Sequence, residues 1–139
     1  MKVKIKILTP VHIGSGEEIN PMEYLVEGVQ FHRLNMDSLF KDNEFKPHMD
    51  KFIEIAKTSR YIAGILPDSL LKKHILYTIP INGDAVQYLR KNQTIVKEFI
   101  KTAGNVFIPG SSIKGSIFSA VFWHSLKEAY KDTIKIGKN

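Results

Sequence analysis

The 139-residue chain is 43% hydrophobic, and its 20 Lys and Arg residues against 14 Asp and Glu residues give a formal net charge of +6. This composition predicts one globular domain over residues 1–139 and excludes a disordered chain. The positive charge favours an anionic partner, which is a nucleic acid, an acidic protein or a membrane surface. The absence of cysteine excludes a disulfide framework and a thiolate metal site.

No stretch approaches the roughly 18 consecutive apolar residues that a transmembrane helix needs. The N-terminus is charged and alternating, unlike a signal peptide. We therefore expect a cytoplasmic protein without membrane contact. No motif predicts a metal site or a cofactor, so neither is expected.

Lysine alternates with aliphatic residues from Lys2 to Ile7. A period of two predicts a strand with one basic and one apolar face. The basic face, which includes Lys4 and Lys6, has two interpretations. It is either an ordinary solvated surface or a surface that follows a phosphate backbone.

A glycine-containing segment with the sequence TPVHIGSG follows at Thr9–Gly16. Pro10 ends the predicted strand, and the two glycines permit a loop that approaches a ligand closely. The spacing differs from that of a dinucleotide-binding motif, and no helix pattern follows. His12 is a candidate ligand-contacting or catalytic group, although a lone histidine more often packs within the protein.

The middle of the chain predicts a hairpin and a helical insertion at about residues 35–74. Asn35 is expected to cap the first insertion helix. The elements rest on hydrophobic periodicity and turn residues. In chain order they are strands at Met22–Val26 and Val29–Leu34, helices at Met36–Phe40, Pro47–Thr58 and Pro67–Lys73, an extended segment at Ile75–Ile81 and a helical turn at Asp84–Arg90.

Thr94–Thr102 fits either a helix or a strand. Its β-branched residues and the following Gly104-Asn105 turn favour a strand that pairs with Val106–Ile108. A final helix is predicted from about Ser112 to Lys131, and its wide apolar stripe predicts burial against a sheet.

The start of this helix has the features of an anion site. Ser111 and Ser112 are good N-cap residues after Pro109-Gly110. The unpaired N–H groups of the first turn, the helix dipole and Lys114 together suit a phosphate. Gly110 and Gly115 are predicted to have no room for a side chain. The alternative is a capped helix whose lysine is merely solvated.

As a pair, the segments TPVHIGSG and IPGSSIKG resemble the signatures of the RAMP superfamily of CRISPR proteins. Pro21–Leu25 is similar to the segment that follows the first signature in the Csm5 family, the subunit at the head of type III-A Csm complexes. The resemblance spans about residues 3–121.

The resemblance implies an α+β, ferredoxin-like (RRM-type) domain with an antiparallel sheet, helical insertions and glycine-rich loops. It implies a non-catalytic subunit that binds the CRISPR RNA (crRNA) near its 3′ end, contacts other Csm subunits and assists crRNA maturation. Trimming would be done by a recruited nuclease. The residues on signature positions are Gly14, Ser15, Gly16, Gly110, Ser111, Ser112 and Lys114. With the strand lysines and the loop histidine, Lys4, Lys6 and His12, they form the predicted RNA-binding set.

The chain departs from the family pattern in two ways. Phe118 stands where many relatives have an arginine. The family also usually continues into a second RAMP domain, so we expect an N-terminal fragment or a truncated or split subunit.

Two other functions remain open. A metal-independent crRNA-processing endoribonuclease needs a general base and acid around a 2′-OH, and His12 with Lys114 or Tyr24 is the only such combination in the sequence. A protein-interaction domain without RNA binding would carry its basic charge for solubility.

Overall fold

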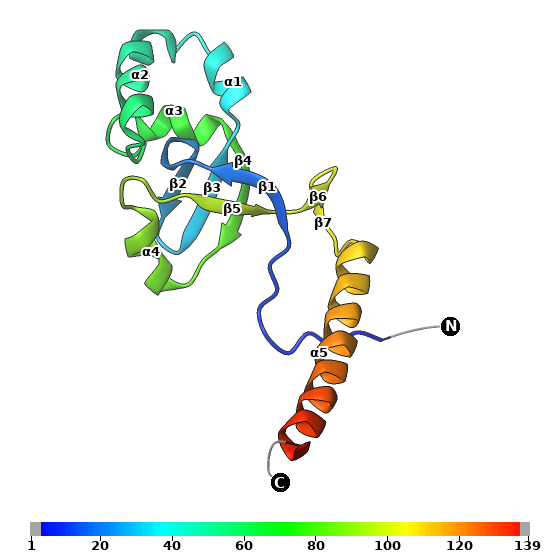
Figure 1. Ribbon diagram of the computed structural model, residues 1–139. Coiled ribbons are helices and arrows are strands. Elements are labelled where there is room, and N and C mark those ends of the chain that lie inside the picture. The colour runs from blue at the N-terminus through cyan, green and yellow to red at the C-terminus, as the bar shows by residue number, and fades with distance from the viewer. Residues whose placement is uncertain (1–3, 137–139) are drawn as a thin grey trace. The chain divides into compact units, whose positions relative to one another are not determined.

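The computed structural model describes residues 4–136 of the chain, with side-chain surroundings up to residue 130. The chain divides into two compact units. Figure 1 shows the chain coloured by residue number. We call residues 16–98 the central unit and residues 1–15 with 99–139 the terminal unit. The prediction of a single domain over residues 1–139 stays a prediction.

The central unit is built on an antiparallel sheet of order β2-β3-β4. The β2–β3 hairpin pairs Val26 with Phe31, and its turn uses Gly28 at φ +55°. The predicted hairpin is confirmed, but Met22 and Glu23 are in a 3₁₀ turn closed by the Asn20 amide, which donates to the Glu23 carboxylate at 2.7 Å. The strands are β2 (Tyr24–Glu27), β3 (Gln30–Leu34) and β4 (Ile75–Pro80).

Three helices lie between β3 and β4 in the sequence, and a fourth follows β4 (Figure 1). The predicted cap at Asn35 is confirmed, since its side chain accepts from the Ser38 amide at 3.0 Å. The predicted helices of this region are also confirmed within a few residues. They are α1 (Met36–Lys41), α2 (Met49–Thr58), α3 (Asp68–Lys73) and α4 (Gly83–Leu89).

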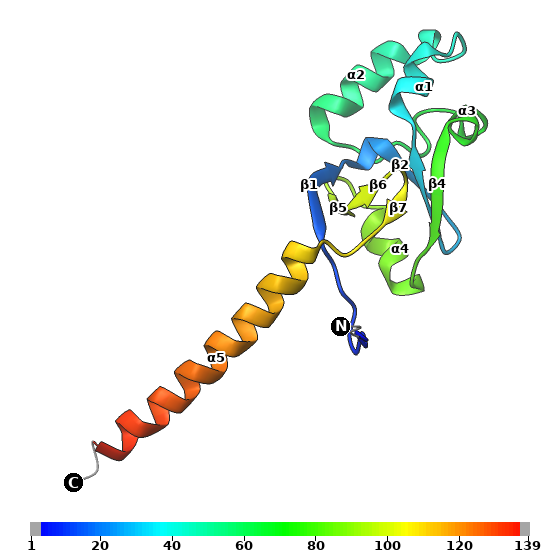
Figure 2. The same cartoon turned by 90° about the vertical axis from the view of Figure 1, so that its right-hand side faces the viewer.

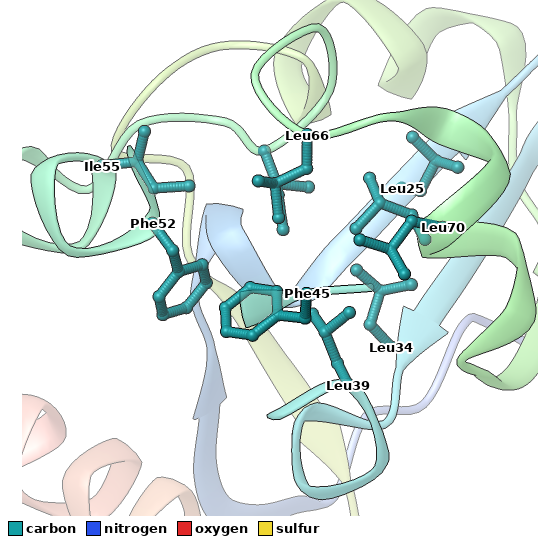
Figure 3. Close-up of a cluster of buried hydrophobic side chains, with 10 residues drawn as sticks. Leu25, Leu34, Leu39, Phe45, Phe52, Ile55, Leu66 and Leu70 are labelled. Carbon is teal, nitrogen blue, oxygen red and sulfur yellow. The ribbon is translucent and has the colours of Figure 1, made fainter. Parts of the chain in front are cut away.

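The two faces of this sheet carry separate hydrophobic clusters, because successive strand residues point to opposite faces. Leu25 and Leu34 pack with α1, α2 and α3, as Figure 3 shows. Tyr24, Val26 and Phe31 form the other cluster, against which side chains of α4 pack. The α+β class with antiparallel sheets is therefore confirmed.

The remaining strands form two-stranded sheets. β1 (Gly14–Ile19) pairs with β5 (Val96–Phe99). β6 (Lys101–Thr102) and β7 (Asn105–Val106) form a hairpin whose two-residue turn has positive φ at Ala103 and Gly104. The hairpin leads into α5 (Gly110–Ile136), one continuous helix in Figure 2.

The predicted strand at the N-terminus is wrong in its described part. Residues 4–8 have no regular secondary structure, whereas the second half of the predicted glycine loop begins β1. Alternation selects two faces, but a strand also needs a hydrogen-bonded neighbour. The described residues supply none for residues 4–8. Lys2 and Val3 lie outside the described residues.

The strand predicted at Val106–Ile108 ends at Val106. In the β6–β7 register the next partner of Phe107 would be Ile100. The Ile100 amide donates instead to the Ile13 carbonyl at 2.8 Å. The ladder therefore has two residue pairs, Thr102 with Asn105 next to the turn and Lys101 with Val106 as the last pair.

The final helix begins earlier than predicted, at Gly110. The Pro109 carbonyl accepts from the amides of Ser112 and Ile113 at 3.0 and 3.2 Å. Ser111 and Ser112 are thus in the first turn and are not the N-cap. The predicted burial of the apolar stripe is also wrong, since Phe118 is 70% exposed and Trp123 62% exposed.

None of the helices described between residues 4 and 136 combines the length and apolarity that crossing a bilayer requires. Among the same residues, no group of three His, Asp or Glu side chains is arranged to hold a metal ion.

Candidate nucleic-acid interface

Both glycine motifs contribute to one cleft in the terminal unit. The cleft has a volume of about 570 Å³ and is lined by two segments that are about 100 residues apart in the sequence. The first segment contributes Ile5, Lys6, Ile7, Leu8, Thr9, Val11, His12 and Ile13, and the second contributes Ile108, Ser112, Ile113, Ser116 and Ile117.

Most of this lining is aliphatic, and its polar groups come from the two motifs, from Lys6 and from Ser116. An apolar wall with a few polar groups suits a planar or apolar group of a ligand. A phosphate, by contrast, is bound by cations and amides at an accessible edge. The cleft is therefore chemically divided between aliphatic residues and a polar set that includes His12 and Ser112.

The first motif is held by main-chain and ring contacts. The Ile13 carbonyl accepts from the Ile100 amide at 2.8 Å, which fixes residue 13 beside the segment that leaves β5. The His12 ring stands edge-on to the Phe99 ring, with centroids 5.7 Å apart and planes at 85°. His12 is nevertheless exposed, so its imidazole remains accessible to a ligand.

The second motif forms the first turn of α5. The amides of Gly110 and Ser111 precede the first hydrogen bonds of the helix, at the positive end of its dipole. Lys114 is exposed and one turn further along. The Ser116 hydroxyl is used within the helix, where it donates to the Ser112 carbonyl at 2.9 Å.

The predicted RNA-binding residues are therefore only partly brought together. Lys6, His12 and Ser112 line the cleft. Outside its lining are Lys4, Gly14, Ser15, Gly16, Gly110, Ser111 and Lys114. Gly16 has φ +91° at the start of β1, a conformation that favours glycine. An RNA-binding role for any of these residues stays a prediction.

The prediction that Gly110 and Gly115 lack room for a side chain is wrong for this chain by itself. A Cβ built at either position meets open space. Neither glycine has a positive φ. Only a bound ligand or partner could therefore demand glycine there.

Tyr24 does not suit the acid–base pair considered above. Its side chain is fully buried, and its hydroxyl is 2.7 Å from the Leu89 carbonyl and 3.2 Å from the Thr94 carbonyl, to which it donates. Burial, followed by the neighbouring Tyr61, raises the pKa of Tyr24 well above its usual range. Its proton is committed to the main chain and does not reach a solvent-exposed substrate.

A second, smaller pocket in the central unit was missed by the sequence analysis. It has a volume of about 390 Å³, and Tyr61, Asp68 and Arg90 are among its lining residues. The Val26 amide donates to the Tyr61 hydroxyl at 2.7 Å, and Arg90 donates to the Val26 carbonyl at 3.3 Å. These side chains cover the main chain at the free edge of β2. No local pattern links residues so far apart in the sequence.

The sequence profile of the RAMP superfamily matches residues 4–137 of the chain. The chain is 28% identical over 150 residues to the Methanocaldococcus jannaschii protein described as "CRISPR system Cms protein Csm5", covering 98% of this chain and 34% of that protein. A Streptococcus thermophilus protein of the same description is 28% identical over 129 residues, covering 84% and 36%.

Two solved structures are similar to the chain. The crystal structure of T. onnurineus Csm5 has a TM-score of 0.68 and 32% identity, covering 88% of this chain and 34% of that one. A chain in the cryo-EM structure of a type III-A Csm–crRNA–target RNA ternary complex has a TM-score of 0.63 and 30% identity, covering 88% and 32%. The chain thus spans about a third of the length of each of these relatives.

Proposed function

Because the chain belongs to the RAMP superfamily, we propose that it acts as a crRNA-binding and assembly subunit of a type III-A Csm complex, or as part of such a subunit. One observation carries this proposal. Two motifs from opposite ends of the chain line one cleft, in a chain that is 30% identical to a component of a Csm–crRNA–target RNA complex. The net charge of +6 supports an RNA partner.

Within such a complex, we assign the chain the role that its resemblance to the Csm5 family implies. The subunit binds the crRNA near its 3′ end, contacts neighbouring Csm subunits and assists maturation, while a recruited nuclease trims the RNA. The complete fold is then the ferredoxin-like, RRM-type arrangement. The antiparallel β2-β3-β4 sheet with helices on its faces supports this fold.

The two kinds of residue around the cleft would contact different parts of the RNA. The exposed Lys4, Lys6 and Lys114 suit phosphates. His12 suits stacking on a base, because its ring is accessible and already braced by Phe99. Gly14, Ser15, Gly16, Gly110, Ser111 and Ser112 would offer main-chain amides and hydroxyls to the backbone.

The proposed subunit is not an enzyme. Metal-independent cleavage needs a positioned base and acid. Tyr24 is buried and committed to main-chain carbonyls, and Lys114 is outside the lining of the cleft that contains His12. These placements favour binding over the endoribonuclease alternative.

Equilibrium RNA binding tests the proposal. The purified chain should bind single-stranded RNA with an affinity that falls steeply with salt, because counterions are released from each neutralised phosphate. The input RNA should be recovered intact. Failure to bind at low salt would favour the protein-interaction alternative, and site-specific cleavage would favour the endoribonuclease.

A further inference from the structure

The two units differ in how far their apolar side chains are buried. Every buried hydrophobic residue of the described chain belongs to the central unit. In the terminal unit six large apolar residues of α5 that follow Ile113 are more than half exposed: Ile117, Phe118, Val121, Phe122, Trp123 and Leu126. We call these six residues the α5 apolar set. Apolar patches of this kind mark interaction sites.

The α5 apolar set extends around more than one side of the helix. At 3.6 residues per turn, Ile117 and Val121 form one row, Phe118, Phe122 and Leu126 form a second, and Trp123 lies beyond it. Phe118 and Phe122 are already stacked, with centroids 6.2 Å apart and planes at 5°. A helix that is apolar around so much of its circumference is typical of a buried position.

The N-terminal segment lacks a hydrogen-bonded neighbouring strand among the described residues. Residues 4–7 have the alternating sequence of a strand, but no described residue pairs with residues 4–8 in a ladder. Ile5 and Ile7 line the same cleft as Ile117 of α5. One added strand could do two things here. It could form hydrogen bonds with the main chain of residues 4–8, and its side chains could cover the exposed apolar residues of α5.

We propose that the terminal unit is an acceptor for a second polypeptide segment, which adds a β-strand along residues 4–8 and packs apolar side chains over the α5 apolar set. The occupant is a segment of the kind that makes up the other two thirds of the Csm5 relatives. This choice rests on their length, since the chain covers only 34%, 36%, 34% and 32% of the four similar proteins.

The acceptor surface overlaps the proposed RNA contacts only at Lys4 and Lys6, whose main chain would pair with the added strand. Alternation places their side chains on the face opposite Ile5 and Ile7, where they stay available to phosphates. The other proposed contacts, which include His12, Ser112 and Lys114, are outside residues 4–8 and the α5 apolar set. The proposal depends on membership of the family but not on RNA binding. A chain that fails to bind RNA could still accept the segment, and the reverse also holds.

The test mixes the full chain with the part of the Methanocaldococcus jannaschii Csm5 that lies outside the matched region. We expect a 1:1 complex by light scattering, and amide hydrogen exchange at residues 5–8 slowed at least tenfold. A second version joins this part to Asn139 through a Gly/Ser linker. The linker raises the effective concentration to about the millimolar range, so that a weak affinity between species is still detected.

Two matched variants locate the contact. Phe118→Asp should reduce complex formation at least tenfold, whereas Ile53→Asp, at an exposed position of α2, should not. Both positions are exposed, so circular dichroism should report unchanged melting of the chain alone.

Three results would overturn the proposal. The first is no exchange protection in either version. The second is a complex that Phe118→Asp leaves intact. The third is protection of residues 5–8 in the chain alone, as a monomer or as a dimer, because the occupant would then be the chain itself or a second copy.

Discussion

The ring of His12 stands edge-on against Phe99, with centroids 5.7 Å apart, and keeps its imidazole accessible beside the cleft. In the proposed function this imidazole binds and does not transfer protons. Incubation with a crRNA precursor, with and without Mg²⁺, should therefore give no site-specific product from the wild type or from His12→Ala. His12→Ala should weaken RNA binding by the loss of about one stacking contact, roughly 1–3 kcal/mol. Cleavage that disappears in His12→Ala would instead identify an endoribonuclease.

Substituting a glycine of the second motif should distinguish an effect on stability from an effect on RNA binding. Gly110→Val should leave the melting of the chain within about 0.5 kcal/mol of wild type, because its Cβ meets open space. It should still weaken RNA binding if the RNA approaches that backbone. Gly28→Ala is the control for strain, since Gly28 has φ +55° in the β2–β3 turn and the change should cost about 1 kcal/mol. A Gly110→Val chain that unfolds as easily as Gly28→Ala would contradict this account.

The Tyr61 hydroxyl accepts the buried Val26 amide at the edge of β2. Tyr61→Phe removes that acceptor and leaves a buried N–H without its partner, which should lower the free energy of unfolding by about 1–3 kcal/mol. Tyr88→Phe, at a 57% exposed position, is the matched control and should change it little. Urea denaturation of both variants makes the comparison. Equal stabilities of the two would mean that the contact contributes nothing.

Asp42 provides a pH dependence. Its carboxylate accepts from the Glu44 amide at 2.8 Å and contacts His74 Nε2 at 2.9 Å, and these two bonds, in that order, lower the pKa of Asp42. A carboxyl with a lowered folded pKa adds stability above its unfolded pKa of about 3.9, and that stability is lost as the pH falls through the folded value.

Below about pH 4, wild type should therefore lose stability more steeply than Asp42→Asn. Glu54→Gln, on the exposed face of α2, is the control and should follow wild type. Denaturation midpoints between pH 6 and pH 2 provide the measurement. Parallel curves for wild type and Asp42→Asn would show that ionisation of Asp42 does not contribute to the stability of the fold.

The central unit was largely predictable from the sequence because its signals are local. Gly28 marks the hairpin turn, and Asn35 and Asn82 accept main-chain amides at the starts of α1 and α4. The 3₁₀ turn before β2 was missed because the strand was extended back to Met22, although the Asn20 main-chain and side-chain amides donate to the Glu23 carboxylate and close a turn there.

The terminal unit was predicted less well because its N-terminal segment and α5 are not paired with or covered by other described residues. The alternation of residues 4–8 defines faces but supplies no neighbouring strand. The apolar stripe of α5 predicts burial but does not identify the element that covers it, and its described side chains from Ile117 on are exposed. The site was anticipated in part, since His12 and Ser112 share the cleft. Its aliphatic wall was not anticipated, because Ile5 and Ile7 were assigned to one face of a sheet.

The dependence of RNA affinity on salt for Lys114→Ala tests the central claim most directly. The matched control is Lys127→Ala on the same helix, where the ammonium is 5.0 Å from the centre of the Trp123 ring. On two unrelated single-stranded RNAs, Lys114→Ala should weaken binding about equally and flatten the slope of log K against log salt by roughly 0.7, whereas Lys127→Ala should leave the slope unchanged. An unchanged slope for Lys114→Ala, or a loss on only one of the two RNAs, would contradict a phosphate contact at the start of α5.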